Sequence, residues 1–192
     1  FLARVQASLY FMNNIADETI FNRARRQVLI NAVPFVVLFL IFVGVTLTAD
    51  GYELNPVNGE VFVRKYKYFF NLIEMPWVAV MFLIGVVSVL YAIIRAAFSK
   101  TWICGIWYSG IGTVLVVLSL FFLAGYNNTP YYPSAVDLQS SLTIYNSSSS
   151  LFTLEVMTVV SFLVPFVLAY IVYAWRAMDK KPITEQEMES GE

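Results

Sequence analysis

Four long apolar stretches alternate with polar segments along the chain, and each of them is long enough to cross a lipid bilayer. They cover residues 28–48, 76–94, 102–123 and 151–175. A helix rises about 1.5 Å per residue, so about 20 apolar residues cross a hydrocarbon core of about 30 Å. Because the backbone in lipid must satisfy its own hydrogen bonds, each stretch is expected to be helical. The pattern predicts an all-α fold, a polytopic transmembrane helix bundle with four complete spans.

The segment 1–27 has a different pattern. Val5, Leu9 and Met12 recur at helical spacing, a polar stretch follows, and three arginines fall between residues 23 and 26. We interpret the segment as the tail of a preceding helix that runs into a cytoplasmic interfacial segment, where arginines meet anionic headgroups. The chain begins without methionine, and we expect a fragment that starts inside or just after an earlier helix.

The distribution of lysine and arginine predicts the orientation of the spans. If the four spans alternate, the basic residues at 23–26, 95–100 and 176–181 fall on one side of the membrane. The connection 126–150, which contains no lysine or arginine, falls on the other side, and the basic residues at 64–67 weaken this bias without reversing it. Cytoplasmic loops are enriched in lysine and arginine. The predicted divisions are an amino-terminal segment over 1–27, a membrane domain over 28–176 and a cytoplasmic tail over 177–192.

The last span begins with polar residues and carries one charge. Asn146 and the serines 147–150 can supply side-chain oxygens for the free N–H groups of its first turn. Glu155 suits the positive end of the helix dipole if it lies in an early turn. Two interpretations of Glu155 stay open, a cap at the interface or a contact with a proton or a partner. We expect no ionisable residue in the middle of a span, where a charge would mark function.

The third span carries small residues at regular spacing. Gly105, Ser109 and Thr113 fall four apart, and such a ladder lets another helix approach closely. General helix packing is the simpler interpretation, and a face that docks a specific partner is the alternative.

The composition agrees with a membrane protein and limits its chemistry. Apolar residues make up 59% of the chain and charged residues 13%, whereas soluble domains carry about 25% charged residues. The net charge of −1 gives no support for nucleic-acid binding. The single cysteine, Cys104, cannot form an internal disulfide, and its apolar neighbours predict that it is buried.

The sequence contains no histidine, which excludes the most common haem ligand, metal ligand and general base. It also shows no phosphate-binding glycine loop and no pair of carboxylates on one helix face. We therefore expect no catalytic residue, no cofactor-binding residue and no metal ligand in this chain. From the residues alone the prediction is a four-span membrane module, and a part of a transporter or of another membrane assembly is the alternative.

One polar segment and the start of the span after it form a specific motif. The segment reads Ser141-Leu142-Thr143-Ile144-Tyr145-Asn146-Ser147-Ser148-Ser149-Ser150, and Thr153-Leu154-Glu155-Val156-Met157 follows. This motif closely resembles the carboxyl-terminal signature of subunit II of cytochrome bd-type quinol oxidases. The signature positions are Ser141, Leu142, Thr143, Asn146, Ser147, Ser148, Thr153, Leu154 and Met157. Shorter stretches at 7–10, 22–25 and 131–134 resemble the same subunit with lower specificity.

The resemblance covers the whole chain and about the second half of the family's subunit. It implies a complex in the cytoplasmic membrane of a bacterium or archaeon that oxidises quinol and reduces dioxygen to water. It also implies a larger partner, subunit I, which carries haem b, haem d and the quinol site, while subunit II ligates no haem. On this basis the expected contacts of the chain are subunit I and membrane lipid, and quinol is reached through the partner.

Overall fold

The computed structural model describes residues 1–99 and 101–178 of the chain. The predicted tail from residue 179 onward lies outside the described residues. The prediction of an all-α bundle with four spans is confirmed, because four helical segments are long and apolar enough to cross a membrane. The helices are α1 (Leu2–Asn14), α2 (Glu18–Thr48), α3 (Lys67–Glu74), α4 (Pro76–Phe98), α5 (Gly105–Gly125), α6 (Leu151–Ser161) and α7 (Val164–Met178).

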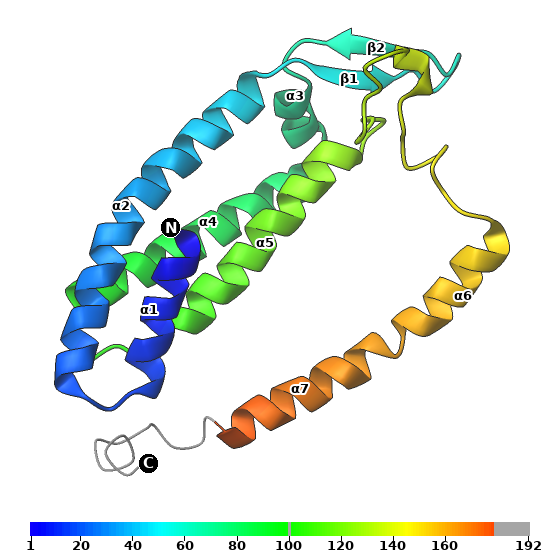
Figure 1. Ribbon diagram of the computed structural model, residues 1–192. Coiled ribbons are helices and arrows are strands. Elements are labelled where there is room, and N and C mark those ends of the chain that lie inside the picture. Colours follow the sequence, from blue (N-terminus) through cyan, green and yellow to red (C-terminus); the bar gives the residue numbers. More distant parts are fainter. Residues whose placement is uncertain (100, 179–192) are drawn as a thin grey trace.

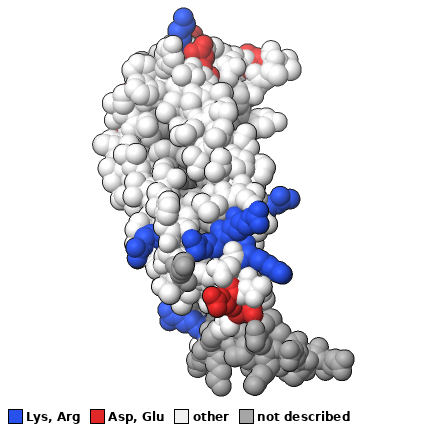
Figure 2. Space-filling view, turned by 90° about the vertical axis from the view of Figure 1, so that its left-hand side faces the viewer, with Lys and Arg blue, Asp and Glu red and all other residues white. Residues whose placement is uncertain are grey.

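Two short strands and a 3-10 turn lie at one end of the bundle (Figure 1). β1 (Gly51–Leu54) and β2 (Val61–Arg64) pair antiparallel, and η1 (Leu138–Ser140) lies beside β2. We call this end the hairpin end. The opposite end, where α2 begins, carries Arg23, Arg25 and Arg26, and we call it the basic end. Figure 2 shows that charged residues on the face in view gather toward the two ends and leave a broad uncharged band between them.

α2 begins earlier in the chain than the predicted first span, which starts at residue 28. α2 begins at Glu18, where the side chain of Asp17 accepts a hydrogen bond from the Ile20 N–H, so the arginines belong to the same continuous helix as the span. An acidic cap and an acidic first residue both favour a helix start at this point. α1 lies antiparallel beside α2, and its apolar stripe packs into the core there. Buried members of this core include Val5, Leu9, Met12, Ala24 and Val28.

α4 and α5 form an antiparallel hairpin and make the most extensively packed helix pair of the bundle. Gly85 and Gly112 meet between them. The ladder on the third span packs inside the chain: a Cβ on Gly105 would lie 2.7 Å from Leu9 of α1, and Ser109 is fully buried. These contacts support general helix packing. Cys104, predicted to be buried, is exposed just before α5, so that expectation was wrong.

The last span, predicted as one helix over 151–175, is two helices with a break between Ser161 and Val164. Pro165 explains the break, because proline has no N–H to donate to the carbonyl of residue 161. Around the break the backbone uses the tighter i to i−3 bonds, such as that from the Leu163 N–H to the Val160 carbonyl. The described side chains of α6 and α7 are not buried, and both helices lie apart from the bundle (Figure 1).

Candidate functional site

The most polar group of contacts lies at the hairpin end, where α3 meets β1, β2 and the turn after α5. We call it the polar cap and define it by Glu53, Arg64, Lys67, Asn71, Glu74, Asn127 and Thr129. Four of these residues are ionisable, with two positive and two negative charges, so the cap is neutral as a whole.

Lys67 is the buried centre of the polar cap, with no exposed surface. Tyr66 adopts a left-handed conformation (φ 55°), which turns the chain from β2 into α3 and directs Lys67 inward. The Lys67 Nζ lies 3.2 Å from a Glu53 carboxylate oxygen and donates to the Asn127 carbonyl at 3.1 Å. Burial lowers the pKa of Lys67, and the nearby Glu53 carboxylate opposes this shift.

Arg64 joins the two carboxylates of the cap. Its Nη1 donates to both oxygens of Glu53, at 3.0 and 3.1 Å, and its Nη2 donates to Glu74 at 3.2 Å. Its guanidinium also lies over the ring of Phe70, 4.6 Å from the centroid. The hydrogen bonds from Arg64 to Glu53 raise the pKa of Arg64 further above its usual value.

Asn71 lies one turn after Lys67 on the same face of α3 and is fully buried. Its Nδ2 donates to the Leu123 carbonyl at 3.0 Å and to the Thr129 hydroxyl at 2.8 Å. The Leu123 carbonyl belongs to the last turn of α5, where carbonyls lack partners within the helix. Asn71 therefore joins α3 to the end of α5 and to the connection that follows.

The turn after α5 closes the cap. Asn127 and Asn128 both have positive φ, near 55°, a conformation that asparagine tolerates better than most residues. The Asn127 Nδ2 donates to Asn71 at 3.1 Å and to the carboxylate of Glu74. This hydrogen bond, followed by the charge of Arg64, lowers the pKa of Glu74.

Every charged side chain of the cap has a partner. Each carboxylate is paired, and each cation has an anionic or carbonyl partner. Such a network holds elements together, and its buried members are costly to remove one at a time. The cap therefore holds α3, the β1–β2 hairpin and the connection 126–150 together.

The signature positions divide between the connection 126–150 and α6. Ser141 and Thr143 are buried within this connection, and Leu142 pairs with Tyr132 in an isolated antiparallel bridge. The Asn146 side chain accepts from the Thr143 N–H at 2.7 Å and donates to the Ser141 carbonyl at 2.9 Å. The hydroxyls of Ser147 and Ser148 bond to carbonyls four residues earlier.

The remaining signature positions, Thr153, Leu154 and Met157, lie on α6 and not in the connection. Thr153 supplies the N–H that the Ser150 hydroxyl caps at the start of α6, and Leu154 and Met157 are exposed along that helix. Ser150 thus performs the predicted capping role, whereas Asn146 bonds within the loop instead. Glu155 is exposed and lies beyond the first turn of α6, so the structure does not place it as a cap.

Two cavities accompany these features. One of about 130 Å³ lies at the hairpin end between the turn at 125–129 and residues 143–145, and polar groups line part of it. A larger one of about 220 Å³ lies within the apolar band between α1, α2, α4 and α5, with Phe35, Phe39, Val89 and Val116 among its walls. Its lining suits hydrocarbon and offers no site for chemistry among the described residues.

The described residues do not bring together the ligands that a resident metal ion would need. Among the described residues, no three histidine, cysteine, aspartate or glutamate side chains come close enough together to hold a metal ion. The sequence supplies no histidine and one cysteine, so the usual axial ligands of haem are missing apart from scattered methionines. We derive no redox step through this chain.

Sequence reasoning missed the polar cap. It treated Arg64 and Lys67 only as loop charges, although Lys67 and Asn71 are spaced four apart and therefore share a face of any helix formed there. That spacing was the available signal. The partners Glu53 and Asn127 lie 14 and 60 positions away from Lys67, and nothing local in the sequence links them to it.

Comparisons with known proteins agree with the signature. Residues 1–178 match the family described as cytochrome bd terminal oxidase subunit II. The chain is 30% identical over 176 residues to a protein of Haemophilus influenzae (strain ATCC 51907 / DSM 11121 / KW20 / Rd) called probable cytochrome oxidase subunit 2. That similarity covers 84% of this chain and 44% of the relative, so the chain spans about half the length of the curated protein that it matches.

Proposed function

Because the chain belongs to the cytochrome bd terminal oxidase subunit II family, we propose that it serves as a membrane subunit of a quinol oxidase that ligates no haem. In this proposal the complex transfers electrons from quinol to dioxygen and forms water. The haem b, the haem d and the quinol site belong to the larger subunit I, with which this chain assembles. The observation that carries the proposal is the family match over nearly the whole chain, residues 1–178.

The composition of the chain supports this division of roles. A subunit that ligated haem itself would need axial ligands, and histidine is missing from the sequence. The polar cap supports a role in holding helices and connections in place, since its charges are paired with each other and none is free to act on a substrate. The four spans support a multi-pass location in a membrane.

We propose the orientation from the charges at the two ends. Arg23, Arg25, Arg26 and Arg95 lie at the basic end, where the Arg25 Nε also donates to the Ala97 carbonyl near the end of α4 at 2.8 Å. By the positive-inside bias the basic end faces the cytoplasm, and the hairpin end with its polar cap faces outward. The carboxyl tail then lies on the cytoplasmic side of a bacterial or archaeal membrane.

Co-purification with spectroscopy tests the proposal. The tagged chain is purified from its native membrane in mild detergent, and a reduced-minus-oxidised spectrum is recorded together with quinol-dependent oxygen uptake. We expect a stable complex that contains a larger, histidine-bearing subunit and shows absorbance of haem b and haem d. The same chain expressed alone should show neither. A stable native complex without haem absorbance would end the proposal.

A further inference from the structure

An aromatic cluster that includes one arginine lies where α4 ends and α5 begins, at the basic end. The rings of Tyr91, Trp102 and Tyr108 pack together, with centroids 5.4 to 5.9 Å apart. The guanidinium of Arg95 lies over the Trp102 ring, 5.9 Å from its centroid. Tyr91 and Arg95 are one turn apart on the same face of α4, and both are exposed. We call these four residues the arginine–aromatic cluster.

The same two helices carry a second group of three rings at the hairpin end. Trp77, Phe122 and Tyr126 pack edge to face there, with centroids 4.8 to 6.5 Å apart. Along α4, Arg95 lies about 27 Å from Trp77, and the hydrocarbon core of a bilayer is about 30 Å thick. Tryptophan and tyrosine gather at both membrane interfaces. The two ring groups therefore mark the two interfaces, and Arg95 lies at the level of the lipid headgroups.

The polar groups of the arginine–aromatic cluster are hydrogen-bond donors without protein partners among the described residues. The ion pairs there all belong to the polar cap, and the Arg95 guanidinium donates to no carbonyl at the end of α4. The hydroxyls of Tyr91 and Tyr108 also make no hydrogen bond in this part of the chain. The α4–α5 pair supplies no carboxylate, since residues 75–136 contain no aspartate or glutamate. The cluster is thus suited to an anionic group from outside the chain.

The surface next to the cluster is apolar toward the middle of the membrane. Val80, Ile84 and Val87 are exposed, and helical spacing places them on the face of α4 that carries Tyr91 and Arg95. A ligand that fits this face has an anionic group at the level of Arg95 and a hydrocarbon chain that runs along α4 from there. This is the layout of a membrane phospholipid.

We propose that the arginine–aromatic cluster binds the phosphate of an anionic phospholipid in the leaflet at the basic end. The guanidinium fork matches two phosphate oxygens, and phenolic hydroxyls can donate to the others. An anionic headgroup is favoured over a zwitterionic one, because the cluster contains no carboxylate to pair with an ammonium group. Among the described residues no cation lies over the rings of the Trp77 group, so we expect no such preference in the opposite leaflet.

Lipid binding to the purified protein tests the proposal. The chain is isolated from its membrane with the proteins that it assembles with, its lipids are exchanged for detergent, and dioleoyl phosphatidylglycerol is titrated while native mass spectrometry counts the bound lipids. Arg95→Gln should weaken the tightest phosphatidylglycerol site about fivefold, as expected for one basic residue at an anionic headgroup. Arg95→Lys, which keeps the charge but loses the fork, should lie between Arg95→Gln and the wild type.

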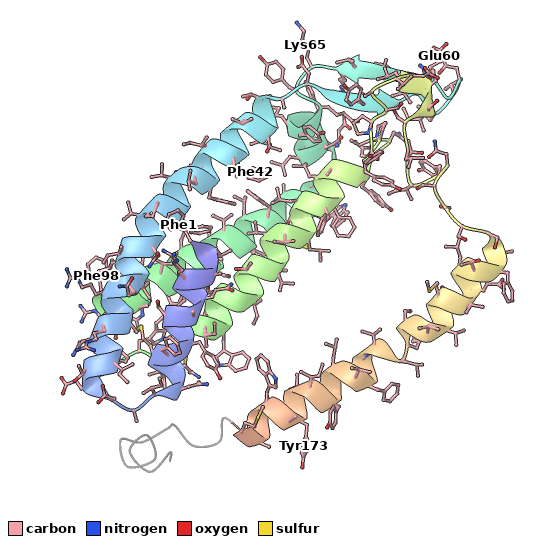
Figure 3. All side chains as sticks on the ribbon, in the orientation of Figure 1. Phe1, Phe42, Glu60, Lys65, Phe98 and Tyr173 are labelled. Atoms are coloured by element: carbon pink, nitrogen blue, oxygen red, sulfur yellow. The ribbon has the colours of Figure 1, made fainter. Side chains whose placement is uncertain are left out.

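The controls separate this site from general charge. Lys65→Gln removes an exposed basic residue at the hairpin end, whereas Phe98, close to Arg95 on α4, lies toward the opposite end (Figure 3). This variant should bind phosphatidylglycerol as the wild type does. Dioleoyl phosphatidylcholine and inorganic phosphate should bind wild type and Arg95→Gln alike. Equal phosphatidylglycerol affinity of Arg95→Gln and the wild type, or an equal loss in Lys65→Gln, would overturn the proposal.

A photoreactive phosphatidylglycerol with a diazirine on its acyl chain shows where the lipid lies. In nanodiscs, labelled peptides should come from the end of α4 and the start of α5, with less label there in Arg95→Gln. If this region stays unlabelled, another protein covers it and the proposal fails.

Two conservative changes keep the proposal testable if Arg95→Gln folds poorly. Tyr91→Phe together with Tyr108→Phe keeps the ring packing and removes only the two hydroxyls, and this double variant should bind phosphatidylglycerol more weakly than the wild type. Unchanged affinity would contradict the donor arrangement. None of these measurements uses haem absorbance or oxygen uptake, so their outcome is independent of the proposed oxidase function.

Discussion

Gly85 on α4 and Gly112 on α5 face each other so closely that the carbonyl oxygen of each fills the space a side chain would need on the other. A Cβ on Gly85 would lie 2.8 Å from the Gly112 carbonyl oxygen, and a Cβ on Gly112 would lie 2.7 Å from the Gly85 carbonyl oxygen. Small residues allow this approach, and helix association in membranes depends on such packing. The pair therefore sets the distance between the two most extensively packed helices.

Gly112→Ala should weaken the α4–α5 hairpin. The methyl group meets backbone, which cannot rotate away, so we expect a loss of about 1–3 kcal/mol of stability. The thermal unfolding midpoint of the purified complex in detergent measures it. Gly110→Ala is the matched control on the same helix, since a Cβ there meets nothing within 4 Å. Equal midpoints for the two variants would contradict the role of the glycine contact.

Asn71→Ala should loosen the polar cap. The Asn71 amide bonds to the Leu123 carbonyl and the Thr129 hydroxyl, and its removal leaves both buried groups without this donor. We expect a loss of about 1–3 kcal/mol, read from the unfolding midpoint. Asn58→Ala removes an exposed asparagine of the hairpin turn, which bonds to Glu60, and should cost much less.

Asn127→Gly should change how stability depends on pH. The hydrogen bond from Asn127 is the main cause of the lowered pKa of Glu74. Because the folded pKa lies below the usual 4.5, the stability that Glu74 contributes is present above pH 4.5. It is lost as the pH falls through the folded pKa. The variant should therefore be less stable than the wild type near neutral pH, and this difference should shrink in acid. Unfolding midpoints from about pH 7 to about pH 3 measure it.

Asn128→Gly provides the control for this pH experiment. Asn128 shares the positive φ of Asn127, so glycine suits both backbones, but among the described residues its side chain makes no hydrogen bond. Its midpoint curve should run parallel to that of the wild type across the pH range. A deficit of Asn127→Gly that stays constant down to the most acidic condition would refute the coupling to Glu74.

The spans were predictable because their signal is local. Apolar runs of about 20 residues need no tertiary information, and the structure places a candidate spanning helix over each of the four predicted stretches. The boundaries were less predictable. The start of α2 at Glu18 follows from the Asp17 cap, which a reading by hydropathy overlooks, and the break near Pro165 follows from a lost backbone donor.

The polar cap could not be read from the sequence, since it depends on contacts between distant segments. Lys67 looks like one loop charge among three until Glu53 and Asn127 are placed beside it. The Gln6–Thr113 hydrogen bond between α1 and α5 joins residues 107 positions apart, so no local pattern announces it. The signature serines were recognised as a motif, but their local bonding emerged only from the structure.

Gln139→Ala should release η1 from β2. The Gln139 side chain accepts from the Val61 N–H at 2.9 Å and donates to the Val61 carbonyl at 3.0 Å, as a neighbouring strand would. Losing both bonds should cost about 1–2 kcal/mol, equivalent to about five- to thirtyfold faster exchange of the Val61 amide if it exchanges by local opening. Hydrogen exchange with mass spectrometry measures the rate. Val136→Ala, at a fully exposed neighbour, should leave it unchanged.

Asn146→Ala should destabilise the loop 126–150 that leads into α6. Its side chain holds the Thr143 N–H and the Ser141 carbonyl together, and Ser141 in turn accepts from the Ser134 N–H at 3.1 Å. The signature asparagine thus organises the loop from within, and we expect its loss to cost about 1–2 kcal/mol. The yield of assembled complex, followed by haem absorbance, should fall together with the unfolding midpoint.

Two further variants separate the organising role of Asn146 from the general polarity of the serine-rich segment. Asn146→Asp keeps the acceptor for the Thr143 N–H but loses the donor to the Ser141 carbonyl, so it should lie between wild type and Asn146→Ala. Ser149→Ala removes a hydroxyl that makes no hydrogen bond among the described residues and should behave as wild type. If Ser149→Ala lowers the yield as much as Asn146→Ala, the segment acts through its polarity, and the bonding scheme drawn from the structure is not what the complex requires.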